Sequence, residues 1–185
     1  MSRRLPFALP ALSALSALFA GLLVFASARD AHASSGTAIG VDLDYTHGFR
    51  EPFVGSGTGF NVRLGYKLDL LVLQLTPEVG GAYHTFGAGS KGNENAKFSQ
   101  GIVGGRLSFG KILEPGLYAH LGYGHVATDL GGRSGATIDG GLTLDLTILP
   151  LIDLGIHGGY NGMLASGSDS AFDTYVLGVH AALVF

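Results

Sequence analysis

The sequence predicts an all-β fold: an eight-stranded antiparallel up-and-down transmembrane β-barrel, preceded by a cleaved signal peptide. Three observations support this prediction. The 185 residues are 46% hydrophobic and only 14% charged, against about 25% charged in soluble domains, so part of the surface is expected to face something other than water. Along eight segments, apolar and polar residues alternate with period two, which is typical of strands whose faces meet different surroundings. The connections between these segments alternate between short and long, as in membrane barrels.

Residues 1–33 are predicted to form the signal peptide. Arg3 and Arg4 provide a charged start, and an apolar run over 11–25 follows. The alternative is a permanent membrane helix, because the run approaches the lower length limit of about 17 residues. No second apolar helix is indicated later in the chain.

The expected cleavage site follows Ala33, since Ala31 and Ala33 form a small-residue pattern at a suitable spacing behind the apolar run. Cleavage after Ala28 is the alternative. The whole chain has a net charge of -3, and removing three arginines and one aspartate leaves -5 in a mature chain that begins at Ser34. A basic surface for nucleic acid is therefore not expected.

The barrel is expected to occupy residues 34–185. Its sixth strand shows the alternation most clearly, because Leu142, Leu144 and Leu146 alternate with Thr143 and Asp145. The apolar faces are expected to point outward, because in lipid only a closed barrel pairs every backbone group of its strands. A soluble barrel would need the reverse, which would bury charges and expose rows of leucine. The eight predicted strands lie near 39–46, 60–67, 70–86, 100–109, 117–124, 138–148, 154–161 and 174–185.

The predicted connections have two lengths. Short apolar turns are expected at 67–70, 111–114 and 149–151. Four longer polar or Gly-rich loops are expected at 47–57, 86–97, 127–136 and 164–171. An even strand count places both termini on the side of the short turns, which is the periplasmic side in such barrels. Aromatic residues near strand ends are candidate interfacial girdles: Tyr45, Phe60, Tyr83, Tyr123 and Tyr160 near the long loops, and Tyr66, Phe109 and Phe185 near the short turns.

The last segment alternates from Tyr175 onward and ends on an aromatic residue, Phe185. Here the chain resembles the family of small bacterial outer-membrane barrels typified by the OmpA transmembrane domain and OmpX-like proteins. The resemblance implies that Tyr175, Leu183 and Phe185 carry a signal for the barrel-insertion machinery. It also implies an integral location in the outer membrane of a Gram-negative cell, in contact with its lipid and lipopolysaccharide. Pro77 departs from the pattern, and a bulge is expected there because proline removes a ladder hydrogen bond.

Several lumen-facing polar residues are expected at similar heights, where they would form a belt across the barrel. The favoured interpretation is a structural plug of salt bridges and hydrogen bonds, because eight strands leave an interior that side chains fill. The alternative is a proton-sensitive gate, since histidines titrate near neutrality. The belt comprises Asp42, Arg63, Glu78, Arg106, His120, Asp145, His157 and His180.

No catalytic, cofactor-binding or metal-binding residues are predicted. Lipid A deacylases of this architecture carry a His-x-Ser pair, but none of the six histidines after residue 33 is followed by serine two positions later. The stretch Gly87–Gly92 matches GxGxxG but leads into a strand, whereas a nucleotide site needs a following helix. The chain is therefore expected not to be an enzyme.

Three functions stay open, in decreasing order of support. The first is a structural or surface-interaction role, in which the four external loops meet an extracellular ligand. The second is a narrow, pH-sensitive pore for ions or small solutes. The third is a lipid-modifying outer-membrane enzyme with an unrecognised set of catalytic residues.

Overall fold

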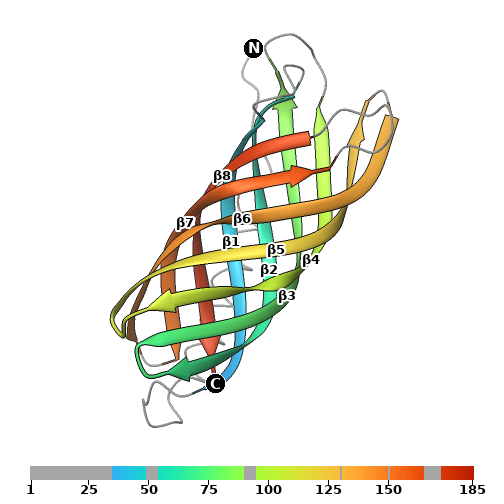
Figure 1. Ribbon diagram of the computed structural model, residues 1–185. Helices are drawn as coiled ribbons and strands as arrows, with labels where there is room; N and C mark the ends of the chain where they lie inside the picture. Colours follow the sequence, from blue (N-terminus) through green and yellow to red (C-terminus); the bar gives the residue numbers. More distant parts are fainter. Residues whose placement is uncertain (1–34, 49–53, 90–94, 130, 150, 165–171) are drawn as a thin grey trace, which may run out of the picture. The chain divides into compact units, whose positions relative to one another are not determined.

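The computed structural model describes residues 35–48, 54–89, 95–129, 131–149, 151–164 and 172–185, which form a closed antiparallel barrel (Figure 1). The predicted signal peptide and both candidate cleavage sites lie outside the described residues. Within those residues, no helix is long and apolar enough to cross a membrane. The strands are β1 (Gly36–Gly48), β2 (Val54–Leu70), β3 (Leu73–Ala88), β4 (Ala96–Phe109), β5 (Leu113–Thr128), β6 (Gly131–Leu149), β7 (Ile152–Met163) and β8 (Phe172–Val184).

The barrel closes between its first and last strands. β1 pairs with β2 on one side and with β8 on the other, so that Asp42 lies opposite both Asn61 and His180. Each of β2 to β7 pairs with the strand before it and the strand after it in the sequence. Closure leaves no open sheet edge, which is the condition for a β-sheet to span lipid. The predicted fold class and strand count are confirmed.

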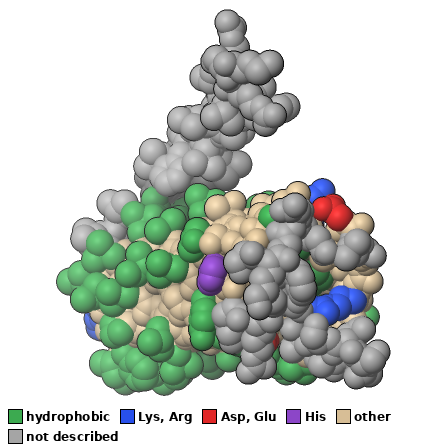
Figure 2. Space-filling model, turned by 90° about the horizontal axis from the view of Figure 1, so that it is seen from above, with side chains coloured by type: hydrophobic (Ala, Val, Ile, Leu, Met, Phe, Trp, Pro, Cys, Tyr) green, Lys and Arg blue, Asp and Glu red, His purple; other side chains and the backbone are tan. Residues whose placement is uncertain are grey.

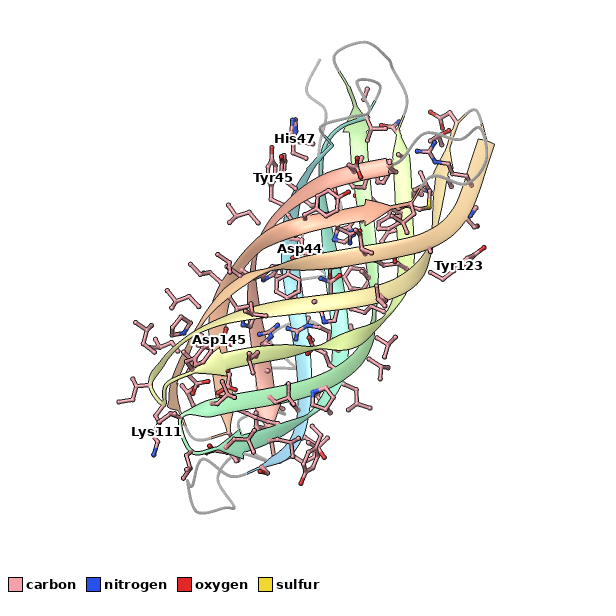
Figure 3. All side chains as sticks on the ribbon, viewed as in Figure 1. Asp44, Tyr45, His47, Lys111, Tyr123 and Asp145 are labelled. Carbon is pink, nitrogen blue, oxygen red and sulfur yellow. The ribbon has the colours of Figure 1, made fainter. Side chains whose placement is uncertain are left out.

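Exposure alternates along the strands as the sequence predicts. On β1, Leu43 and Tyr45 are 51% and 53% exposed, whereas Asp42 and Asp44 between and beside them are buried. Figure 3 shows Tyr45 and Tyr123 pointing away from the barrel, with Asp44 and Asp145 inside it. Hydrophobic side chains cover much of the outer surface visible in Figure 2, where charged side chains are few. An outer surface of this kind, on a closed barrel with a polar interior, belongs in lipid.

The predicted aromatic girdles face outward. Tyr83 and Tyr160 are half-buried, and the other six of the predicted set are exposed: Tyr45, Phe60, Tyr66, Phe109, Tyr123 and Phe185.

The loop predicted at 127–136 is wrong. β5 continues to Thr128 and β6 begins at Gly131, so residues 129–130 alone connect them. Thr128 pairs with Gly131, and the Thr128 hydroxyl donates a hydrogen bond to the Gly131 carbonyl. Glycines and small polar residues suggested a loop here, but pairing with β5 holds the segment in the sheet. Three longer connections remain at this end of the barrel, across 49–53, 89–95 and 164–171, and most of their residues lie outside the described part.

The boundaries of the other predicted connections also differ. The first short turn lies at Leu71–Val72, and the predicted turn residues 67–70 belong to β2. The second short turn lies at 110–112. The third lies at 150–151. At the opposite end of the barrel, the strands extend into the edges of the predicted loops 47–57 and 86–97.

The bulge predicted at Pro77 is also wrong. Pro77 lies opposite Gly105 in an unbroken ladder between β3 and β4. On the other side, the ladder to β2 has no pairs between Gly65–Glu78 and Leu68–Leu75, yet the register is the same on both sides of the gap. The missing proline N–H is therefore accommodated by a local gap in one ladder rather than by an inserted residue.

Candidate functional site

The lumen of the barrel is the candidate site, and its end near the longer connections is apolar. Phe86, Phe98 and Phe172 are all at most 3% exposed and meet edge to face or tilted, with ring centroids 5.4 to 5.6 Å apart for the Phe86–Phe172 and Phe98–Phe172 pairs. This cluster was not predicted, because apolar side chains were assigned to the lipid face and most of its members lie at or beyond the ends of the predicted strands. We call it the apolar cap; its members are Val54, Phe86, Ala96, Phe98, Val126, Met163 and Phe172.

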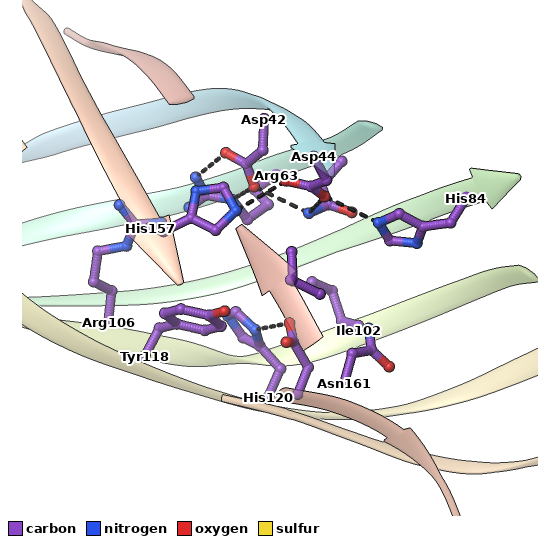
Figure 4. A pocket seen from close by; sticks show the side chains of 13 residues that line it. Asp42, Asp44, Arg63, His84, Ile102, Arg106, Tyr118, His120, His157 and Asn161 are labelled. Atoms are coloured by element: carbon purple, nitrogen blue, oxygen red, sulfur yellow. Dashed lines mark hydrogen bonds and ion pairs between the residues drawn. The ribbon is translucent and has the colours of Figure 1, made fainter. Parts of the chain in front are cut away.

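Arg63 on β2 is the centre of the polar layer below the cap (Figure 4). Its Nε and Nη2 donate to the two carboxylate oxygens of Asp42 at 2.9 and 2.6 Å, and its Nη1 donates to Glu78 at 2.7 Å. All three side chains are at most 6% exposed. A guanidinium suits this position because its planar fork pairs with one carboxylate in a bidentate manner and still reaches a second.

His120 on β5 lies between two carboxylates. Its Nε2 is 2.7 Å from Glu78 and its Nδ1 is 3.0 Å from Asp139. Ionised carboxylates only accept hydrogen bonds, so both ring nitrogens must carry a proton to donate. The doubly protonated, cationic imidazole satisfies both contacts and extends the ion-pair network from Arg63 to Asp139.

A second chain of contacts crosses the lumen through two histidines. His157 Nε2 is 2.9 Å from Asp44, the Nδ1 atoms of His157 and His180 are 3.3 Å apart, and His180 Nε2 is 2.6 Å from Asp145. Which ring nitrogens donate along this chain depends on the histidine tautomers, and His180 Nε2 also has Arg106 Nη1, which can only donate, as a neighbour at 3.1 Å.

The two chains join into one network. Asn61 Nδ2 donates to both Asp42 and Asp44, and Arg106 Nη1 lies 3.4 Å from Asp145 and 3.1 Å from His180 Nε2. The structure thus brings together all eight residues of the predicted belt. It adds four that the prediction did not include in the belt: Asp44, Asn61, His84 and Asp139.

Each histidine in the network lies opposite a glycine on the neighbouring strand. A Cβ on Gly178 would lie 2.6 Å from His157 Cε1, and a Cβ on Gly104 would lie 2.7 Å from His120 Cδ2. The imidazole rings therefore lie over positions without side chains, which accounts for part of the high glycine content. The four pairs are His84–Gly59, His120–Gly104, His157–Gly178 and His180–Gly155.

A third layer fills the lumen near the short turns. Lys67 Nζ lies 2.9 Å from Asp153 and 3.4 Å from Glu114, and Gln74 Nε2 donates to the other oxygen of Glu114. This cluster was not predicted, because Glu114 was expected in a turn and Lys67 at the boundary between a strand and a turn. The observed strand boundaries bring both into the lumen.

Two small cavities lie inside the barrel, of about 20 Å³ above Arg63 and Arg106 and about 40 Å³ below them. Both arginines line both cavities, so their side chains separate the two spaces. A buried water needs about 10 to 15 Å³, so each cavity has room for one or a few waters.

The residues of the predicted insertion signal lie on the outer face of β8. Tyr175 and Phe185 are exposed and Leu183 is half-buried. The backbone of Phe185 exchanges hydrogen bonds with Thr37 at 2.8 and 2.9 Å, which completes the closure onto β1.

Two Ser–His contacts occur on the outer surface, each across one hairpin. His47 Nδ1 is 3.0 Å from Ser56 Oγ, and His125 Nδ1 is 2.8 Å from Ser134 Oγ. Each histidine lies directly opposite its serine in the ladder, which a local sequence motif does not reveal. Among the described residues, no group of three or more His, Asp and Glu side chains is placed to hold a metal ion.

Comparison with known proteins relates the chain to solved structures only. No protein-family model matches the sequence, and no curated protein does. Neisserial surface protein A is 16% identical, over 83% of this chain and 100% of that chain, with a TM-score of 0.61. Ail of Yersinia pestis, in complex with the heparin analogue sucrose octasulfate, is 17% identical over 81% of this chain and 99% of that chain, with a TM-score of 0.47. The outer membrane protease OmpT of Escherichia coli is 8% identical over 82% of this chain and 95% of that chain, with a TM-score of 0.41.

The similarity to the neisserial protein concerns the fold. The chain has the fold of the small, integral β-barrels of bacterial outer membranes, and the expected resemblance to that group is confirmed at this level.

Proposed function

We propose that this protein is a closed, non-conducting outer-membrane barrel with a structural or surface-interaction role. The observation that carries the proposal is the filled lumen, in which the apolar cap, the Arg63 network and the Lys67 cluster follow one another along the barrel. A hydrated ion would have to displace all three layers. Breaking any one of the buried ion pairs would leave an uncompensated charge in the lumen.

The interaction itself is assigned to the end of the barrel with the longer connections. Loops on a rigid barrel are free to carry binding residues because the sheet does not depend on them. The neisserial protein with the same fold is named as a surface protein, which supports this assignment. The expected partners are outer-membrane lipid, lipopolysaccharide and an extracellular ligand at these loops.

Conductance in planar bilayers tests the closed lumen. We expect no channel openings from the purified full chain at neutral pH, under conditions in which a porin in the same lipid incorporates and conducts. Discrete openings from the wild-type protein would disprove the plug.

The second candidate, a pore gated by protons, is favoured by the Asp44–His157–His180–Asp145 chain. If those histidines control a gate, conductance should vary with pH and His180→Ala should abolish the variation. An absence of channel openings at every pH rules out the gate and supports the plug.

We also propose that the barrel is not an enzyme. Within the described residues, no carboxylate contacts the second ring nitrogen of His47 or His125, so neither Ser–His contact has the third group that orients a general base. Mass spectrometry of outer-membrane lipids should show the same species with the wild type and with Ser56→Ala. Deacylated lipid that disappears in Ser56→Ala or Ser134→Ala would instead establish the lipid-modifying enzyme.

A further inference from the structure

The end of the barrel that carries the short turns is unusually apolar. In the β2–β3 turn, Leu71 is 84% and Val72 is 66% exposed, and in the β4–β5 turn Ile112 is 65% exposed. Turns that protrude into water are ordinarily built from polar residues and glycine. Here the sequence places large apolar side chains at the positions with the greatest exposure.

The backbone of these turns is paired within the protein. The carbonyl of Val72 accepts a hydrogen bond from Gly110 N–H at 3.1 Å, that of Ile112 from Thr147 N–H at 2.9 Å, and that of Leu151 from Val184 N–H at 2.9 Å. Each turn therefore bonds to the strand or turn that follows it around the barrel. In water, solvent molecules could donate hydrogen bonds to these carbonyls, whereas in lipid each carbonyl needs a donor from the protein.

Two of the turns hold leucine in the left-handed region of backbone conformation. Leu71 has φ of 78° and Leu151 has φ of 67°. Glycine or asparagine is preferred in this region, because the Cβ of most other residues crowds the following carbonyl. Leu71 therefore adopts an unfavourable backbone conformation, and its side chain extends the apolar surface beyond Leu70, the last residue of β2.

Charged groups near this end turn inward. Lys67 pairs with both Glu114 and Asp153 in the lumen, and Lys111 is the charged side chain among the described turn residues at this end. Lys111 lies at the end of the barrel in Figure 3, where a long stem lets an ammonium reach the headgroup layer. The lipid-facing surface of β2 continues through the exposed Leu70 into Leu71 without a polar boundary.

We propose that the short-turn end is immersed in the membrane, with Leu71, Val72 and Ile112 in contact with the lipid acyl chains of the leaflet at that end. The barrel then does not project into the aqueous space below it. This goes beyond the surface role proposed above, because it assigns a second lipid contact at the opposite end of the molecule.

Tryptophan fluorescence tests the proposal, since the chain contains no tryptophan. Leu71→Trp and Ile112→Trp are introduced separately into the full chain and reconstituted in phosphatidylcholine vesicles with brominated acyl chains. Tyr123→Trp, on the outer face of the barrel, is the control for lipid contact, and Asp129→Trp, in the exposed β5–β6 turn, is the control for water.

We expect both turn variants to emit at short wavelength and to be quenched by bromine to within about twofold of Tyr123→Trp, with little quenching by aqueous iodide. Emission and iodide quenching like those of Asp129→Trp would overturn the proposal. Protection from both quenchers would also overturn it, because a second copy of the chain would then cover the turns. Two sites are used so that one variant that fails to fold does not decide the result.

Discussion

Arg63 illustrates at the scale of one residue how the lumen is held closed. Its guanidinium contacts both Asp42 and Glu78, and Glu78 in turn contacts His120. The charges of Arg63, Asp42 and Glu78 are shielded from water by the barrel wall, so each is stabilised mainly by the opposite charge beside it. Removing one partner leaves the others buried and unpaired, which costs more than the pair itself contributes.

We predict that Arg63→Ala lowers the free energy of unfolding by about 3 to 5 kcal/mol, because Asp42 and Glu78 lose their shared cation. Urea titration of the protein folded in lipid vesicles measures this change. Lys111→Ala, which removes a cation from the exposed β4–β5 turn, is the control and should change the value by less than about 0.5 kcal/mol. Equal effects of the two substitutions would show that the lumen pairs do not stabilise the fold.

Gly178 tests the fit between histidine and glycine. A Cβ there would lie 2.5 Å from Asp44 Oδ1 and 2.6 Å from His157 Cε1, whereas a Cβ on the outward-facing Gly101 meets nothing within 4 Å. Gly178→Ala should therefore destabilise the barrel by about 1 to 3 kcal/mol through overpacking, and Gly101→Ala should be close to neutral. The same urea titration compares them. A neutral Gly178→Ala would mean that the ring of His157 moves away freely.

At the scale of elements, the β5–β6 hairpin shows how pairing overrides local composition. Its residues 131–136 are mostly glycine and small polar residues, yet they pair with β5 across the whole segment. The first β7 pair lies at Thr137, so among the described residues only the Ala136 carbonyl, which accepts from Leu164 N–H, is bonded on the β7 side of this segment. An antiparallel strand directs successive N–H groups to alternate sides.

Amide hydrogen exchange in lipid should therefore alternate along residues 131–136, with every second amide protected. From Thr137 to Leu146, where β6 pairs on both sides, we expect continuous protection. NMR or mass spectrometry with short peptides distinguishes these patterns. Uniformly fast exchange over residues 131–136 would restore the loop that the sequence suggested.

At the scale of the whole molecule, closure between β1 and β8 determines how the barrel unfolds. With every strand paired on both sides, no strand can separate without breaking the two ladders that it forms with its neighbours. The unheated protein should therefore resist dodecyl sulfate and migrate differently from the boiled protein on a gel, and it should fractionate with the outer membrane. A chain truncated before Phe172 lacks β8 and leaves one edge of β1 and one edge of β7 unpaired, so we expect no heat-dependent shift from it. A soluble wild-type protein without such a shift would contradict the assignment of lipid to the outer face.

The sequence by itself determined the number of strands, which of their side chains point into the barrel and which point outward, and the polar character of the lumen. These follow from period-two alternation, which lipid imposes on each strand separately and which can be recognised without knowing its partners. Asp42, Arg63 and His180 were assigned to the lumen on this basis. The alternation failed at Phe98 and Phe172, because near the end of the barrel the inward positions are apolar as well.

Only the tertiary structure decided which residues meet. Asp44 and His157 are 113 residues apart in the chain, and their contact depends on the register of every strand between them. A pattern of alternating residues is unchanged when a strand slides by two positions, so it does not encode that register. The hydrogen-bonded ladders and the closure of β1 onto β8 fix it, and with it the network of ion pairs that fills the lumen.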